Sequence, residues 1–274
     1  MNVPFGKAIA RKSGSTVPRL LCFDFDGTMV CNRSNQPVSR ELLEELEHWL
    51  RNGVTWLINT GRRLPELQDG LAQRQIDRTP HFVVVEETGL FECRSPSEWL
   101  PLGDWNERRD EALRSLKKRA ATAFRAIRRH VTGVAQSVYL DRDLTDEILA
   151  RSEEEMENIV AVIDQIRLDH GLHELGYQRN TIYLRFGHTG FHKGSTLRAL
   201  AEHLRIDSSE ILAAGDNHND LSMLHRSVAH HLICPSNALP VVKEVTRKHG
   251  GVVADRPHGE GLADSLRRIR LTSG

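Results

Sequence analysis

The sequence predicts an α/β fold: a Rossmann-like, doubly wound parallel sheet interrupted by a smaller α+β insertion. Short apolar runs rich in β-branched residues alternate with amphipathic helical patterns, which is typical of a parallel sheet covered on both faces. This alternation stops near residue 99 and returns near residue 189. Polar side chains directly follow the apolar runs, and ligands of such sheets bind beyond the carboxyl ends of the strands.

The first part of the predicted sheet comes from three apolar runs. We expect buried strands at residues 20–25, 54–58 and 81–85. A helix over residues 41–50 separates the first two strands, because its leucines and tryptophan recur on one face. Gly53 follows this helix at the position where a left-handed residue is favoured.

The middle of the chain has a different pattern, with an αββαββ order. Ser152 and Glu155 form a capping-box pattern that opens the second of its helices. The expected elements are a helix near 113–131, strands near 134–140 and 147–149, a helix after 152, and strands near 172–178 and 181–186.

The α/β alternation then resumes to the end of the chain. The expected elements are a helix after Lys193-Gly194, strands at 211–214, 231–234 and 252–253, a short helix at 221–224 and a last helix at 262–271. We therefore predict a core domain from residues 18–98 and 189–274, an inserted domain at 99–188, and a flexible leader at 1–17.

Composition limits the classes of partner. The 274 residues include 37 basic and 37 acidic side chains, and this balance indicates neither a nucleic-acid nor a membrane partner. No apolar stretch reaches the roughly 18–20 residues of a membrane span. The four cysteines have no metal-type spacing and no disulfide framework. A cytoplasmic location is expected, and the oligomeric state stays open.

Acidic residues follow two of the predicted strands. Asp24 and Asp26 lie one residue apart, so they point to the same side of an extended chain. Such crowded carboxylates stay ionised only beside a cation or a basic side chain. Asp216 and Asp220, spaced i, i+4, can also face one point. Carboxylates around one centre suit Mg²⁺, although an N-capping Asp216 with an exposed Asp220 is the alternative.

Four short signatures together resemble a known family. They are Asp24-Phe25-Asp26-Gly27-Thr28, Thr60-Gly61-Arg62, Lys193-Gly194 and Gly215-Asp216-Asn217-His218-Asn219-Asp220. In this order they resemble the haloacid dehalogenase superfamily, specifically its Mg-dependent phosphatases. The insertion lies where the resemblance implies a C2-type cap, as in the Cof-like and the sucrose- or trehalose-phosphate phosphatase groups.

The resemblance implies a phosphomonoester hydrolase with Mg²⁺ as cofactor. Asp24 would attack phosphorus to form an aspartyl-phosphate, and Asp26 would act as general acid and base. The direct metal ligands would be Asp24, Asp216 and the backbone carbonyl of Asp26. Asp220 would act through water or from outside the direct ligands.

Further residues are expected around the phosphoryl group. Thr60 can donate a hydrogen bond to a phosphoryl oxygen, with the Gly61 amide nearby. Lys193 supplies the positive charge that the acids require. Arg62 could add a substrate contact, and an exposed salt bridge is the alternative. The resemblance implies that Asn219 orients the Asp24 site and contacts the substrate.

The expected substrate is a small phosphorylated metabolite, most readily a sugar phosphate. A nucleotide, cofactor or phosphoglycerate-type phosphatase, a phosphomutase and a non-catalytic regulator are the alternatives. The residues of the insertion that are candidates for recognising the leaving group are Arg142, Asp143, Arg179, Asn180 and Tyr183. Cap-bearing relatives often have Asn-Gly after the third strand, where this chain has Glu87-Thr88-Gly89, so a substrate contact from this turn is not carried over.

Overall fold

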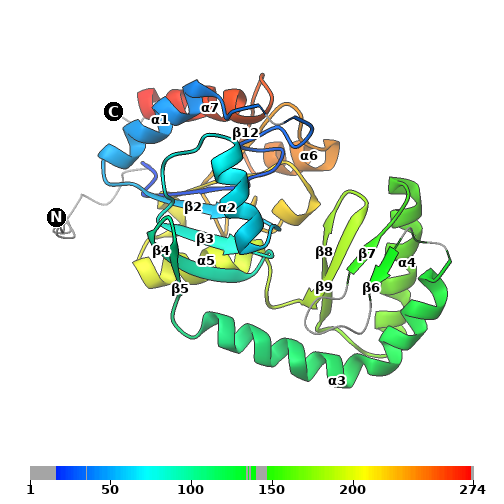
Figure 1. Ribbon diagram of the computed structural model, residues 1–274. Helices are drawn as coiled ribbons and strands as arrows, with labels where there is room; N and C mark the ends of the chain where they lie inside the picture. The colour runs from blue at the N-terminus through cyan, green and yellow to red at the C-terminus, as the bar shows by residue number, and fades with distance from the viewer. Residues whose placement is uncertain (1–16, 35, 134, 136, 140–146, 273–274) are drawn as a thin grey trace.

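The computed structural model contains two β-sheets that lie side by side (Figure 1). It describes residues 17–34, 36–133, 135, 137–139 and 147–272. Helix α3 (Trp105–Val131) runs from the larger sheet toward the smaller one (Figure 1). Among the described helices, none has an apolar stretch long enough to cross a membrane.

The larger sheet has eight strands in the order β12-β11-β10-β1-β2-β3-β4-β5. The six strands from β12 to β3 are parallel, whereas β4 and β5 are antiparallel. This antiparallel edge is not among the elements predicted from the sequence. The strands are β1 (Leu20–Phe23), β2 (Thr55–Asn59), β3 (Phe82–Val85), β4 (Gly89–Ser95), β5 (Glu98–Pro101), β10 (Ile211–Ala214), β11 (His231–Cys234) and β12 (Val252–Val253).

Helices cover both faces of this sheet, which confirms the doubly wound prediction. Leu21 and Phe23 pack into one apolar cluster, and Leu20 and Cys22 pack into the other. The alternation of β1 between two cores explains its unbroken apolar sequence. One cluster contains residues of α1 (Arg40–Arg51), α2 (Leu64–Gln73) and α7 (His258–Thr272), and the other contains residues of α5 (Lys193–Leu204) and α6 (Pro240–Lys248).

The smaller sheet has the order β6-β7-β9-β8 and belongs to the segment from α3 to β9, here termed the inserted segment. Its third apolar cluster joins α3 and α4 to the sheet. The αββαββ order is confirmed, while the division into domains stays a prediction. Its further elements are β6 (Ser137–Tyr139), β7 (Glu147–Leu149), α4 (Glu153–Asp169), β8 (Leu175–Asn180) and β9 (Tyr183–His188).

Local differences from the sequence-based expectations have simple causes. The helix expected at 221–224 is wrong: the structure has a short 3₁₀ turn, η2 (His218–Asp220), followed by turns. Helices α2 and α6 are additional, and each has proline in its first turn, where a missing N–H needs no partner. Of the strand expected at 134–140, residues 134, 136 and 140 lie outside the described residues.

The connectivity creates a crevice at the carboxyl end of β1. The chain passes from β1 to β2 and β3 on one side, and later returns to β10 on the other side of β1. Strand order therefore reverses at β1. Open α/β sheets bind ligands at such a switch point.

One ion-paired carboxylate joins α1 to α7. The Glu45 side chain is 7% exposed and accepts hydrogen bonds from Arg267 (2.9 Å) and Arg270 (3.1 and 3.2 Å). We expect Glu45→Gln to lower the free energy of unfolding by about 1–2 kcal/mol, because one charge-assisted acceptor is lost. Urea denaturation measures this change.

Glu44→Gln is the matched control for this prediction. Glu44 pairs with Arg40 at 2.9 Å on the exposed face of α1, so its effect is expected to stay within about 0.5 kcal/mol. Burial raises the pKa of Glu45, but Arg270 and Arg267 outweigh it and hold this pKa below its ordinary 4.5. The Glu45 contribution is therefore present above about pH 4.5 and is lost as the pH falls through the lowered pKa. Equal effects of the two substitutions would contradict the assignment.

Candidate active site

The ends of four neighbouring strands bring the three predicted residues Asp24, Thr60 and Asp216 together with Glu87, which is not among the predicted site residues. Asp24 follows β1, Thr60 follows β2, Glu87 lies after β3 and Asp216 lies after β10. The Asp24 amide donates to the Ala214 carbonyl at 2.9 Å, and the Thr60 amide donates to the carbonyl of residue 84 at 2.8 Å. Backbone bonds of the sheet therefore hold these residues beyond the strand ends.

Lys193 connects Asp24, the candidate nucleophile, to residues 215–220 after β10, here termed the acidic loop. Its ammonium nitrogen lies 2.6 Å from Asp24 Oδ1 and 2.7 Å from Asp220 Oδ1, and the side chain is fully buried. Burial lowers the pKa of Lys193, but Asp220, Asp24 and Glu87 raise it well above its ordinary value. The ammonium group therefore stays charged and compensates the surrounding carboxylates.

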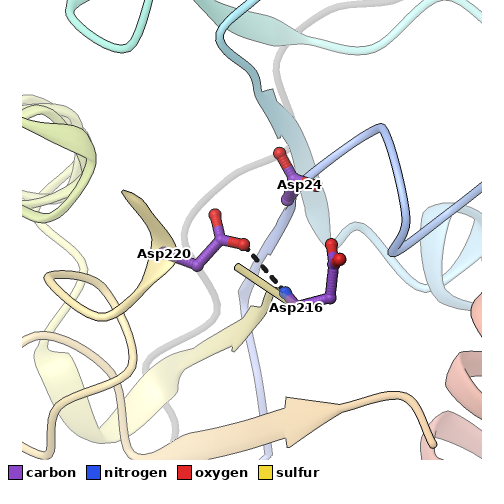
Figure 2. A group of neighbouring side chains, drawn as sticks. All are labelled: Asp24, Asp216 and Asp220. Atoms are coloured by element: carbon purple, nitrogen blue, oxygen red, sulfur yellow. Dashed lines mark hydrogen bonds between the residues drawn. The ribbon is translucent and has the colours of Figure 1, made fainter. Parts of the chain in front are cut away.

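The carboxylates of Asp24, Asp216 and Asp220 converge, as Figure 2 shows. Each offers an oxygen atom, and these atoms all lie within 4.8 Å of one another. Asp220 Oδ2 accepts from the amides of Asp216 (2.8 Å) and Asn217 (2.9 Å), while its other oxygen contacts Lys193. Both oxygens of Asp220 are thus engaged by the protein, which suits a supporting place in a cation site.

Burial makes this cluster electrostatically unfavourable without a cation. It raises the pKa of Asp24 well above its ordinary value; Lys193 opposes this shift, and Asp220 and Asp216 reinforce it. Burial and Asp220 raise the pKa of Asp216 to about 7, against hydrogen bonding from Thr28. One lysine cannot compensate three buried carboxylates.

The donor set fits a hard divalent cation such as Mg²⁺. The cluster offers only oxygen atoms, the ligands that Mg²⁺ prefers. A Cβ at Gly27 would overlap the Asp216 carboxylate, and Gly27 has a φ of +87°. Only glycine therefore lets the turn after β1 approach Asp216 this closely. Thr28 Oγ1 donates to Asp216 Oδ1 at 2.8 Å and orients that carboxylate.

We expect the apparent affinity for Mg²⁺ to fall as the pH drops below about 7. Asp216 has a pKa of about 7 without the metal, so at lower pH the ion must displace a proton to bind. One displaced proton weakens binding about tenfold per pH unit. Calorimetric titration with MgCl₂ between about pH 5.5 and 8, in two buffers of different ionisation heat, measures affinity and proton release. An affinity that is constant over this range would contradict the cation site.

Arg62 holds Asp26 through a two-bond ion pair. Arg62 Nε lies 2.6 Å from Asp26 Oδ2, and Nη2 lies 2.7 Å from Oδ1. The two side chains are 27% and 23% exposed, so the pair is partly buried rather than an exposed salt bridge. The Arg62 guanidinium also lies 5.0 Å from the centre of the Phe25 ring. Asp26 is thereby fixed beside Asp24 at the edge of the cavity.

A cavity of about 480 Å³ opens above these residues. Both sheets contribute to its walls. The lining residues are Asp24, Asp26, Thr60, Gly61, Arg62, Arg63, Glu66, Glu87, Glu147, Asn180, Tyr183, Arg185 and Asn219. Lys193, Asp216 and Asp220 are buried beside it. The structure thus brings all the residues predicted from the four signatures to one place.

The residues predicted to recognise the leaving group fall into three sets. Asn180 and Tyr183 line the cavity. Arg179 does not, and pairs with Glu157 at 2.7 Å. Arg142 and Asp143 lie outside the described residues. Five other lining residues are not among those predicted from the sequence, namely Arg63, Glu66, Glu87, Glu147 and Arg185.

Glu87 is the unexpected acid of the site. Asn219 Nδ2 donates to Glu87 Oε1 at 2.9 Å, so the amide of Asn219 is directed to Glu87. Glu87 Oε2 lies 3.9 Å from the Lys193 ammonium. Glu86 and Glu87 both have positive φ, +49° and +70°. The sequence signal that could have identified them is their position directly after the third apolar run, because site residues also follow the neighbouring predicted strands.

Comparison with known proteins finds a hydrolase family and phosphatase relatives. A profile of the family described as haloacid dehalogenase-like hydrolase matches residues 114–266, more than half of the chain. Phosphoglycolate phosphatase of Staphylothermus marinus is 24% identical, with 92% of this chain and 97% of the relative aligned. The enzyme of the same name from Methanothermobacter thermautotrophicus is 34% identical over 77 residues, which is 28% of this chain and only 32% of that relative.

Solved structures share the fold. The sucrose-phosphatase of Synechocystis sp. PCC6803, solved with sucrose and phosphate, has a TM-score of 0.67 and 16% sequence identity. The superposition covers 93% of this chain and 98% of that one. The resemblance therefore extends over both sheets.

Proposed function

Because the chain belongs to the haloacid dehalogenase-like hydrolase family, we propose that it is a Mg²⁺-dependent phosphatase of small phosphate esters. Asp24 is the proposed nucleophile. One observation carries this proposal: the buried Lys193 ammonium joins Asp24 to Asp220 beside Asp216, at the floor of a cavity. Lys193 donates a hydrogen bond to Asp24 Oδ1, and Oδ2 of Asp24 is the proposed attacking atom.

In the first step, Oδ2 of Asp24 attacks phosphorus. A bond forms between Asp24 and phosphorus, and the bond from phosphorus to the ester oxygen breaks. Asp26 gives its proton to the departing oxygen. Thr60 and the Gly61 amide line the same cavity and donate hydrogen bonds to phosphoryl oxygens, where negative charge develops.

In the second step, Asp26 takes a proton from water, which attacks phosphorus and releases phosphate from Asp24. Arg62 contacts both oxygens of Asp26, and each of these oxygens keeps a second acceptor site for the proton. Arg62 therefore orients the Asp26 carboxyl group for both proton transfers.

A bound Mg²⁺ would neutralise charge on the phosphoryl oxygens and orient them for in-line attack. Asp24, Asp216 and the Asp26 carbonyl would hold it, with Asp220 supporting them through its bonds to the Asp216 and Asn217 amides. Lys193 supplies a positive charge beside both Asp24 and Asp220.

We further propose that the inserted segment acts as a cap that excludes water. Its β8–β9 turn meets the acidic loop, because the Thr181 amide donates to Asn217 Oδ1 at 3.2 Å and Asn217 Nδ2 donates to Thr181 Oγ1 at 3.1 Å. Arg185 Nη1 donates to the Gly61 carbonyl at 3.3 Å. These contacts support a closed arrangement over the cavity.

A sugar phosphate is the proposed substrate class. The cavity volume, about 480 Å³, lies in the range of small-ligand sites. Its upper wall, formed by Glu147, Asn180, Tyr183 and Arg185, is polar, as a polyhydroxy leaving group requires. The second candidate is a phosphoglycolate-type ester, favoured by the names of two sequence relatives.

Phosphate release from a substrate panel tests the proposal. The panel contains p-nitrophenyl phosphate, hexose phosphates, glycerol phosphate, phosphoglycolate and nucleotides, each with MgCl₂ or with EDTA. Release that requires Mg²⁺ supports the phosphatase. Isomerised product without free phosphate would identify a phosphomutase instead, and a folded protein that releases no phosphate from any ester would overturn the proposal.

A further inference from the structure

An ion pair closes the wall of the cavity that faces the phosphoryl site. Arg185 Nε and Nη2 lie 3.1 Å and 3.0 Å from Glu147 Oε1. The two side chains are only 12% and 18% exposed. Both line the cavity, but they come from β9 and β7 of the inserted segment. The pair therefore presents one positive and one negative group with no net charge.

The other arginines of the cavity are also paired. Arg62 binds Asp26, and Arg63 Nε lies 3.7 Å from Glu86 Oε1. Thus each of the three arginines that line the described cavity has a carboxylate partner. A leaving group with its own carboxylate or phosphate would find no unpaired arginine in this part of the described chain. Burying an unpaired anion is costly.

Neutral hydroxyl groups meet a better surface. Glu147 can accept from a hydroxyl group and Arg185 can donate to one, while Tyr183 and Asn180 lie in the same wall. Burial and Glu147 raise the pKa of Tyr183, against the effect of Arg185, so its hydroxyl stays protonated. The Arg185 guanidinium lies over one face of the Tyr183 ring, 5.6 Å from the ring centroid.

We infer that the Glu147–Arg185 pair determines specificity: it admits an uncharged polyol leaving group and rejects leaving groups with a second anionic group. This inference rests on the proposed phosphatase activity and selects the substrate class for the same cavity. Glu147 compensates the charge of Arg185. The pair therefore recognises hydroxyl groups by hydrogen bonding and does not attract a second anionic group. Phosphoglycolate is then a poor substrate, despite the names of the relatives.

Removing one charge of the pair changes the preference. Glu147→Gln leaves the Arg185 charge uncompensated, so kcat/KM for phosphoglycolate is expected to rise about tenfold relative to kcat/KM for glycerol phosphate. Arg185→Gln leaves Glu147 uncompensated, so the same ratio is expected to fall. A purely structural role would lower both activities together and would leave their ratio unchanged.

Glu157→Gln is the matched control, because Glu157 pairs with Arg179 in the same segment but outside the cavity wall. It is expected to leave the ratio as in the wild type. The experiment measures steady-state kinetics for both esters and a thermal melt for each variant. Opposite shifts of the ratio in the two variants support the inference. Shifts in the same direction, unchanged ratios, or a wild type that prefers phosphoglycolate overturn it.

The proposed phosphatase activity, on which this inference rests, is measured separately. Wild-type hydrolysis of p-nitrophenyl phosphate with Mg²⁺, whose leaving group is aromatic and uncharged before release, reports the phosphatase activity independently of polyol recognition. If this activity is present and the ratios do not move, only the specificity inference fails. If it is absent for every ester, the proposed function fails together with the inference.

Discussion

Asp24→Asn is expected to lower kcat for phosphate release by at least about 10⁴-fold. The amide cannot form the acyl phosphate, and removal of a catalytic nucleophile generally has an effect of this size or larger. The fold should persist, because the carbonyl oxygen of the new amide can still accept the hydrogen bond that Lys193 donates to Asp24 Oδ1 at 2.6 Å. Burial disfavours the Asp24 carboxylate, so the neutral amide should not lower the thermal midpoint in EDTA.

Asp77→Asn serves as the control for this substitution. Asp77 is exposed between α2 and β3, and its replacement should leave kcat unchanged. Activity of more than about 1% in Asp24→Asn, in protein free of wild type, would exclude Asp24 as the nucleophile.

Lys193→Met is expected to lower the free energy of unfolding by about 3–5 kcal/mol in EDTA near pH 8. The change leaves the carboxylates of Asp24 and Asp220 buried without their partner, and breaking a buried ion pair has an effect of this size. Urea denaturation measures it. The penalty should shrink toward pH 5, because burial raises the pKa of Asp24 and protonation removes the uncompensated charge.

Two further variants test whether the loss of stability comes from the buried ion pairs of Lys193. Lys118→Met removes an exposed lysine of α3 and should change stability by less than about 0.5 kcal/mol. Adding Asp220→Asn to Lys193→Met should restore part of the lost stability, because it removes one of the unpaired carboxylates. If Lys193→Met and Lys118→Met are equally stable, the buried ion bridge does not hold the site together.

The convergence of Asp24, Thr60 and Asp216 is predictable from the sequence. Each follows an apolar run, and parallel strands have their carboxyl ends at one edge of the sheet. The strand limits of β10 and β11 are likewise predicted to the residue, since both runs end at a turn. Lys193 is harder to place, because it begins helix α5 and does not directly follow a strand, and only its family signature indicates its role.

The remaining part of the site depends on tertiary structure. Glu147 and Arg185 meet only because β7 and β9 pair in the small sheet, where these two residues are direct neighbours. Neither lies in a sequence signature. The antiparallel β4 is equally hard to predict, because the turn before it uses Glu86 and Glu87 at positive φ, where glycine or asparagine would be the usual signal. The missed Glu147 and Arg185 belong to the upper wall of the cavity, where we place the choice of substrate.

A covalent intermediate at Asp24 is the central requirement of the proposed mechanism. Acid quenching of the enzyme during turnover of p-nitrophenyl phosphate with Mg²⁺, followed by proteolysis and fragment mass spectrometry, measures it directly. We predict one phosphoryl group on Asp24 of the wild type within the first turnover, and none in Asp24→Asn. Rapid wild-type turnover with an unmodified Asp24, or a phosphoryl group on another side chain, would contradict the mechanism.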